Sequence, residues 1–303
     1  MTGILEHQQR PKVTVQSEVV SILVVLLIIL SFRECAAAQS SGAPVVLSGI
    51  DSAEGWVTPK EVIAGDKPFI SADAAGRKEW VLSWHDEFEG NSLDRLRWDY
   101  RIDSKFGSVQ LPENVSVADG RLILTLRSQI LRDKHFTGAG VISRETFSHG
   151  YYEARIKFPE ASGWWSAFWL MKNAAGGRAN AGTKDARQEI DIVEHASGWK
   201  PKDGYQINIH WWQGGHFVLG PAKLRVPFPL SGDFHVYGFD YGKRQGVFYL
   251  DGHKVAEVDL TSLPPQEPAS IWLTSIQGMA NSIESNKLPT RMEVDYVRFF
   301  LLK

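Results

Sequence analysis

The chain has 303 residues, of which 43% are hydrophobic and 22% charged, a composition that excludes an intrinsically disordered protein. Its formal net charge of −2 argues against a nucleic-acid partner, which would need a basic surface. The 11 tryptophans predict an aromatic core or a stacking surface for ligands, and the single cysteine excludes a disulfide framework.

The N-terminal segment has the pattern of a targeting sequence. Two basic residues precede an uncharged apolar run at 19–32, and Ala36-Ala37-Ala38 offers a cleavage site. The run is shorter than the ~20 residues of a membrane span. We therefore expect residues 1–38 to be a signal peptide whose cleavage removes Cys35. The mature protein would be secreted or periplasmic, and bacterial, because it would lack disulfides. An uncleaved membrane anchor is the alternative.

The remainder divides into a linker and one domain. Residues 39–77 are rich in Ser, Ala, Gly and Pro, and we expect a linker or an extra edge segment there. From 78 to 303 the sequence pattern is that of β-strands, with runs such as 151–158 and 205–211 in which apolar and polar residues alternate. Asp251-Gly252 between two alternating runs is typical of a hairpin. Many short strands separated by turns predict one all-β sandwich. The small, polar loop at 173–187 is a candidate binding loop.

The most informative stretch carries three carboxylates, Glu189, Asp191 and Glu194, separated by apolar residues. On a helix, at about 100° per residue, these acids would scatter around the axis. On a strand, Glu189 and Asp191 share a face because side chains alternate. One β-bulge at Ile192-Val193 would turn Glu194 to the same face. Crowding three carboxylates costs electrostatic energy and raises at least one pKa, which favours a catalytic role over a solvated, salt-bridged strand face.

Glycoside hydrolysis fits such a set of acids. A retaining glycosidase needs two carboxyl groups about 5–5.5 Å apart, one ionised to attack the sugar and one protonated to release the leaving oxygen. Two glutamates on the same face of a bulged strand can lean together to that separation. A third acid between them can adjust their charge, so no cofactor is expected for catalysis.

The stretch from Glu189 to Glu194 resembles the E-x-D-x-x-E signature of glycoside hydrolase family 16, which includes β-1,3-glucanases, agarases, porphyranases and κ-carrageenases. The other segments that resemble the family, in the same order as its own, are 84–98, 114–122, 140–144, 150–157, 163–171 and 294–298. The resemblance implies a β-jelly roll sandwich of two curved antiparallel sheets, the concanavalin A-like lectin/glucanase fold, with a cleft on the concave face. It also implies that Glu189 is the nucleophile, Glu194 the general acid/base and Asp191 an assistant to the nucleophile.

Two departures from the family pattern leave the identity of the bound sugar undetermined. Members often place a Trp a few residues before the nucleophile, where this chain has 184–187 without one. Ser166 follows Trp165 where Pro is common.

Other residues are candidates for binding. We expect Trp165 to line the cleft, with at least one neighbouring Trp in the core. His210 shares a polar strand face with Asn208. For His210 and for Trp211, substrate binding and a structural role are equally compatible with the sequence. The full set of substrate-binding candidates is Trp165, His210, Trp211, Gln277, Asn114 and Arg144. For Arg144 a surface salt bridge is the alternative to an anionic substituent of the sugar. Glu87, Gly120 and Asp295 resemble positions that hold a structural Ca²⁺ in relatives, with a conventional turn and salt bridge as the alternative.

These expectations describe a secreted, retaining endo-β-glycanase. Its partner would be a polysaccharide, most simply β-1,3-glucan, and we expect a monomer without membrane contact after signal cleavage. Red-algal galactan hydrolysis and transglycosylation are alternatives that use the same acids. A lectin on the same fold is the rival from another class.

Overall fold

The computed structural model describes residues 67–70, 78–172, 188–197, 204–212, 215–263, 267–278 and 283–303. The expected signal peptide, most of the expected linker and the candidate loop at 173–187 lie outside this set, so the domain boundaries stay predictions. Within these residues, no helix has the length and apolar character needed to cross a membrane.

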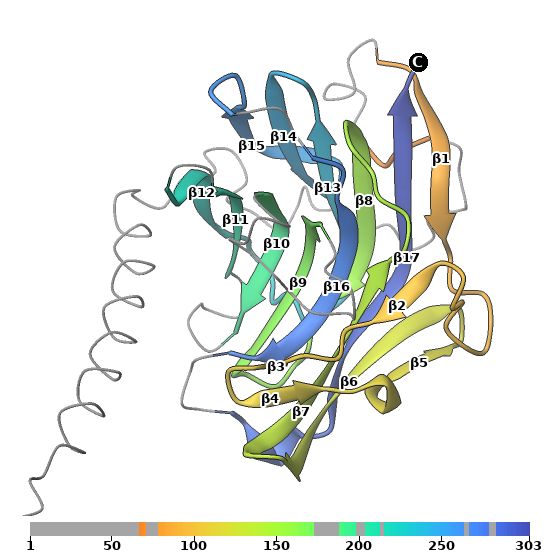
Figure 1. The fold of residues 1–303 in the computed structure, drawn as a ribbon, viewed down its shortest axis with the longest axis vertical. Coiled ribbons are helices and arrows are strands. Elements are labelled where there is room, and N and C mark those ends of the chain that lie inside the picture. Colours follow the sequence, from red (N-terminus) through yellow and green to blue (C-terminus); the bar gives the residue numbers. More distant parts are fainter. Residues whose placement is uncertain are drawn as a thin grey trace, which may run out of the picture. The chain divides into compact units, whose positions relative to one another are not determined.

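The described residues form mainly antiparallel strands (Figure 1), which confirms the predicted all-β fold. One sheet, sheet I, follows the order β15-β14-β13-β8-β17-β6-β5, and β1 pairs with the C-terminal part of β17. Its strands are β1 (Trp80–Asp86), β5 (Val115–Ala118), β6 (Arg121–Leu131), β8 (Gly150–Lys157), β13 (His235–Tyr241), β14 (Gln245–Leu250), β15 (His253–Asp259) and β17 (Thr290–Leu302).

The second sheet, sheet II, follows the order β2-β7-β16-β9-β10-β11-β12. Its strands are β2 (Trp98–Tyr100), β7 (Lys134–Ser143), β9 (Trp164–Met171), β10 (Gln188–Ala196), β11 (Gly204–Trp211), β12 (Phe217–Arg225) and β16 (Ser270–Gln277). The β6–β7 hairpin joins the sheets. A small hairpin of β3 (Ser104–Lys105) and β4 (Ser108–Gln110) attaches to β7 through a parallel pairing. Two short 3₁₀ helices, η2 (Pro112–Asn114) and η3 (Ser285–Lys287), complete the elements.

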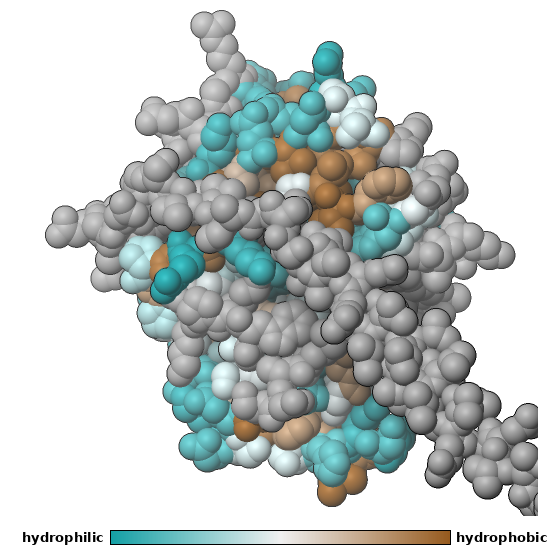
Figure 2. All heavy atoms as spheres, turned by 90° about the vertical axis from the view of Figure 1, so that its left-hand side faces the viewer, coloured by the Kyte–Doolittle hydropathy of each residue, from teal (hydrophilic) through white to brown (hydrophobic). Residues whose placement is uncertain are grey.

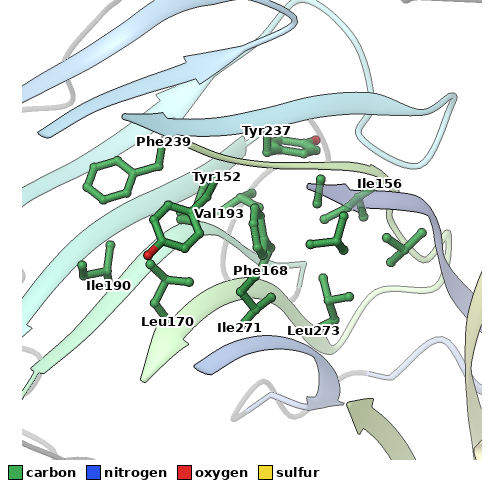
Figure 3. Close-up of a cluster of buried hydrophobic side chains, with 14 of the residues drawn as sticks. Tyr152, Ile156, Phe168, Leu170, Ile190, Val193, Tyr237, Phe239, Ile271 and Leu273 are labelled. Carbon is green, nitrogen blue, oxygen red and sulfur yellow. The ribbon is translucent and has the colours of Figure 1, made fainter. Parts of the chain in front are cut away.

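The hydrophobic core lies between the two sheets (Figure 3). Every second side chain of a strand points into it, so Tyr152 and Ile156 of β8 meet Phe168 and Leu170 of β9. The intervening residues of sheet II point to the opposite face, where polar groups are available for function. The fold therefore offers a second, outward-facing surface on sheet II that the core does not use.

A bulge in β10 sets the direction of the acids. Along β9, Asp191 pairs with Trp169 and Val193 with Phe168, so Ile192 is the additional residue. The pairing with β11 shifts at the same place. The bulge predicted at Ile192-Val193 is therefore confirmed.

Residues 67–70, which belong to the expected linker, pack on the outer face of sheet I. The Phe69 backbone N–H donates to Oε2 of the buried Glu153 over 2.8 Å. Ile70 packs against a small apolar cluster that includes Tyr151. This contact is on the opposite sheet from the acids.

Candidate active site

A pocket on the outward face of sheet II collects the three acids of β10. Residues from β9, β16 and the β3–β4 hairpin complete it. The lining is Arg101, Lys105, Phe106, Trp165, Ala167, Trp169, Glu189, Asp191, Glu194, Thr274 and Ile276. The geometric core of the sequence prediction, three carboxylates facing one way, is therefore present.

Glu194 is buried, and both of its carboxylate oxygens accept hydrogen bonds from neutral donors. Trp165 Nε1 donates to Oε1 over 2.6 Å. Gln206 Nε2 and Asn208 Nδ2 each donate to Oε2 over 2.8 Å. These three donors come from the two strands that flank β10, so the sheet itself fixes the orientation of this carboxyl group.

The two glutamates have raised pKa values. Burial raises the pKa of Glu194 to about 8, and the charge of Asp191 adds to the effect. Burial and the charge of Asp191 likewise raise the pKa of Glu189 to about 7, although the positive charges of His210, Lys105 and Arg101 oppose the rise. At neutral pH the pair can therefore hold a proton on one carboxyl group while the other is ionised.

His210 provides a positive charge beside the acids. Its Nε2 lies 3.2 Å from Oδ2 of Asp191, which is 2% exposed and otherwise has no hydrogen-bond partner at that oxygen among the described residues. Burial lowers the pKa of His210, but Asp191 and the charges of Glu189 and Glu194 outweigh it and raise this pKa to about 9. The contact is therefore an ion pair at neutral pH.

The same three side chains, Glu189, Asp191 and His210, bring possible metal-ligand atoms within 4.8 Å of one another. A metal-binding imidazole must be neutral. A metal ion at this place would have to displace the proton of His210, whose pKa the neighbouring carboxylates raise to about 9.

Aromatic residues form one wall of the pocket. Trp165 stacks on Phe106 with ring centroids 5.7 Å apart and planes 6° apart. Trp169 lies beside it and donates from Nε1 to Thr274 Oγ1 over 3.0 Å. Trp164 is buried in the core, 1% exposed. The structure thus places Trp165 in the pocket and Trp164 in the core, as expected from their alternation along the strand.

The β3–β4 hairpin brings two further residues that the sequence did not single out. Lys105 and Phe106 reach the pocket from its tip, and Arg101 lies beside them. Arg101 is buried and forms an ion pair with Asp103 over 2.7 Å. No carboxylate among the described residues forms an ion pair with Lys105. A single basic residue in a two-residue strand gave no recognisable signal, whereas the polar side chain of Asn208 did.

Two of the substrate-binding candidates lie on the wrong face of their strands. Trp211 pairs with Gln188 and is 3% exposed, on the face opposite His210. Gln277 has the opposite parity from the pocket residues Thr274 and Ile276. A Cβ added to the Gly107 backbone would meet the Gln277 side chain at 1.3 Å, so the two are in close contact. Side-chain alternation corrects both expectations.

Two other candidates are occupied elsewhere. Asn114 is buried, donates from Nδ2 to Thr137 Oγ1 and Gly138 O, and accepts from Arg127 Nε. These hydrogen bonds connect the short helix η2, which precedes β5, to β6 and β7.

Arg144 is exposed and forms an ion pair with Asp99 over 2.6 Å. It does not line the pocket. The salt-bridge alternative for Arg144 is therefore the one that the structure shows.

The expected calcium ligands have protein partners in the structure. Glu87 accepts two hydrogen bonds from Arg298, over 2.9 and 2.8 Å. Asp295 accepts one from Arg155 over 2.8 Å. Gly120 lies in the β5–β6 turn with a φ of 68°, which suits glycine. Because a guanidinium already balances each carboxylate, the contacts do not themselves call for a cation, and calcium stays a prediction.

Comparison with known proteins supports the same conclusion as the geometry. Residues 102–298 match the family described as glycosyl hydrolases family 16. A β-glucanase of Rhodothermus marinus is 27% identical over 251 residues, which cover 73% of this chain and 85% of the relative. A glucan endo-1,3-β-glucosidase of Cryptopygus antarcticus is 29% identical over 191 residues, 57% of this chain and 67% of the relative.

A κ-carrageenase of Pseudoalteromonas carrageenovora is 29% identical over 258 residues, covering 72% of this chain and 64% of the relative. Among solved structures, the LamAcat protein of Zobellia galactanivorans superposes with a TM-score of 0.63 and 25% identity. The match covers 73% of this chain and 97% of that one. The structural match extends over nearly the whole of that protein.

The raised pKa of Glu194 has a consequence for stability. A folded-state pKa of about 8 lies above the ordinary glutamate value, so folding favours the protonated form. The contribution of Glu194 to stability is therefore greatest at low pH and falls as the pH rises from about 4.5 to about 8. We expect Glu194→Gln to raise the free energy of unfolding at pH 8.5, relative to wild type, by about 1 kcal/mol or more. At pH 5 the gain should largely disappear.

Denaturant unfolding at the two pH values measures this difference. The exposed Glu145 provides the matched control, because Glu145→Gln should leave the free energy of unfolding unchanged at both. A gain for Glu194→Gln that is equal at pH 5 and pH 8.5 would show that charge burial is not the cause.

Proposed function

The chain belongs to glycosyl hydrolase family 16 and is a glycoside hydrolase of the endo-β-glycanase type that acts on polysaccharides. On that premise we propose that it is a secreted enzyme that cleaves β-1,3-linked glucan with retention of configuration. The observation that carries the proposal is the grouping of three acids on one face of β10, in one pocket, with raised pKa values on both glutamates. Family membership favours hydrolysis over the lectin alternative.

In the proposed reaction, a carboxylate oxygen of Glu189 attacks the anomeric carbon and forms a glycosyl–enzyme bond. The bond from the anomeric carbon to the leaving oxygen breaks as Glu194 gives that oxygen its proton. Glu194, now ionised, takes a proton from water, whose oxygen attacks the same carbon and releases Glu189. Glu194 has then regained its proton and the bond to Glu189 is broken, so the enzyme is back in its starting state.

The surroundings of the two glutamates suit these different tasks. Glu194 receives hydrogen bonds from neutral donors only, so its ionised form gains no neighbouring positive charge from them. Glu189 lies near the charges of His210, Lys105 and Arg101, which lower its pKa relative to Glu194. The carboxyl group with the higher pKa is the better proton donor, and the one with the lower pKa is the better nucleophile.

The relatives support β-1,3-glucan as the substrate. Two relatives are named glucan endo-1,3-β-glucosidases, and three others are named β-glucanases. The pocket wall of Trp165 and Phe106 presents apolar ring surface of the kind that packs on a sugar ring.

A sulfated galactan is the second candidate. The κ-carrageenase relative matches 72% of this chain, and Lys105 adds a positive charge at the pocket. A cationic side chain there would bind a sulfate substituent. Because Arg144 lies outside the pocket, Lys105 replaces it as the residue on which this candidate depends.

Loss of either glutamate should abolish turnover without unfolding the protein. We expect Glu189→Gln and Glu194→Gln each to lower kcat on the best polysaccharide by two orders of magnitude or more, because each amide loses one half of the acid–nucleophile pair. Reducing-end release measures turnover, and circular dichroism checks the fold. Glu145→Gln should behave as wild type. Near-wild-type turnover by Glu189→Gln would overturn the assignment of the nucleophile.

A substrate panel decides between the two candidates. Laminarin, lichenan, agarose, porphyran and κ-carrageenan are offered to the enzyme, and we expect laminarin to be cleaved fastest, with the β-anomer as the first product in proton NMR. Lys105→Ala should then leave laminarin hydrolysis within a few-fold of wild type, as should the exposed control Lys243→Ala. Preferred cleavage of a sulfated galactan, lost selectively in Lys105→Ala, would support the second candidate instead. Products longer than the substrate would reveal transglycosylation.

Secretion rests on the N-terminal segment alone. We expect the mature protein, expressed in a bacterial host with its own N-terminus, to leave the cytoplasm and to begin at Gln39. N-terminal sequencing of the exported protein measures this. Retention of residues 1–38 in a membrane fraction would support the anchor alternative.

A further inference from the structure

A second histidine lies directly behind His210. Nε2 of His216 is 3.0 Å from Nδ1 of His210, and the two ring planes differ by 22°. The ring centroids are 5.2 Å apart, a separation that together with the short N···N distance places the imidazoles edge to edge rather than face to face. One hydrogen bond therefore joins the two rings nearly in a common plane.

The protonation states of this pair follow from its neighbours. A histidine ring donates from both nitrogens when charged, and when neutral it donates from one and accepts at the other. His210 faces the Asp191 carboxylate with Nε2, and its charged form also carries a proton on Nδ1. Burial and the positive charge of His210 lower the pKa of His216. Neutral His216 is thus able to accept the Nδ1–H of His210 at its Nε2.

Trp212 supports the pair from one side. Its ring is nearly parallel to both imidazoles, at 15° to His210 and 7° to His216, with centroids 5.5 and 4.9 Å away. The indole therefore covers one face of both rings and limits their rotation. Trp212 follows the last residue of β11 and His216 precedes the first residue of β12, and the pairing of Trp211 with Phe217 brings the two together.

β12, which follows His216, lies at the left of Figure 1, on the side that faces the viewer in Figure 2. The described surface there combines apolar and hydrophilic areas. Phe217, the residue after His216, is 54% exposed. His216 is itself exposed.

We propose that His216 is a positioning residue that accepts a hydrogen bond from His210 and so keeps His210 positively charged and oriented between Asp191 and Glu189. The inference rests on the proposed function only for its catalytic consequence. The charged groups that face the His210 ring are Asp191, Glu189 and Glu194, all from β10. Lys105 and Arg101 act on Glu189 as well, so His210 is one of three cations near that carboxylate.

The catalytic consequence appears on the alkaline side. While His210 is charged, it favours the ionised form of Glu189 and holds Asp191 in an ion pair. Loss of the acceptor at Nδ1 makes the His210 proton easier to remove. The ion pair then dissociates at a lower pH, so at pH 8.5 a larger fraction of the enzyme has lost one of the three positive charges near Glu189.

Two substitutions of His216 separate hydrogen bonding from packing. His216→Phe keeps a flat ring against Trp212 but has no acceptor, whereas His216→Gln places an amide oxygen near the position of Nε2. NMR of protein carrying ¹⁵N-labelled histidine follows the titration of His210 directly. We expect this titration to move down by about half a pH unit or more in His216→Phe and to return most of the way in His216→Gln.

Activity provides the second readout. We expect kcat of His216→Phe at pH 8.5 to fall about 1.5-fold for a shift of half a pH unit and about threefold for a shift of one unit, and to change little at pH 6.5, with partial rescue in His216→Gln. Unchanged titration of His210 in His216→Phe, or an equal loss of kcat in both variants at every pH, would overturn the proposal. The NMR titration needs no turnover, so its result is independent of whether Glu189 is the nucleophile.

Discussion

The single additional residue at Ile192 is the constraint on which the site depends. A regular strand would send Glu194 into the core, because side chains alternate between faces and Glu194 is an odd number of residues from Asp191. With the bulge, Val193 pairs with Phe168 and stays in the core while Glu194 faces the pocket. The same bulge thus satisfies hydrophobic burial and gathers the acids, and neither can be changed without the other.

Gathering the acids has an electrostatic cost, which the neighbouring residues partly offset. Asp191 raises the pKa of both glutamates, and His210 opposes this from the adjacent strand. Burial is the larger cause of both raised pKa values, so the cations near the site offset only part of the rise. The raised pKa values are therefore retained at the expense of stability at high pH, which is common where function requires buried charge.

Much of this site was predictable because strand alternation is a local property. The common face of Glu189, Asp191 and Glu194 and the position of the bulge followed from the order of polar and apolar residues. Trp211 was misjudged although the same rule applied, since it has the parity of the buried Ile207 and Ile209. Lys105 and Phe106 were beyond local reasoning, because they reach the acids only through the parallel pairing of β4 with β7. Gln277 belongs to a strand whose sequence marks neither face clearly.

The two sides of β10 divide the chemistry between them. On one side, β9 supplies Trp165, a neutral donor that binds Glu194. On the other side, β11 supplies two further neutral donors to Glu194, Gln206 and Asn208, and also the charged His210 opposite Glu189. His210 pairs with Glu189 across the sheet, and Glu189 has the lower of the two raised pKa values. The register of β11 against β10 places His210 beside Glu189, and Lys105 and Arg101, which lie outside β11, lower the pKa of Glu189 in the same direction.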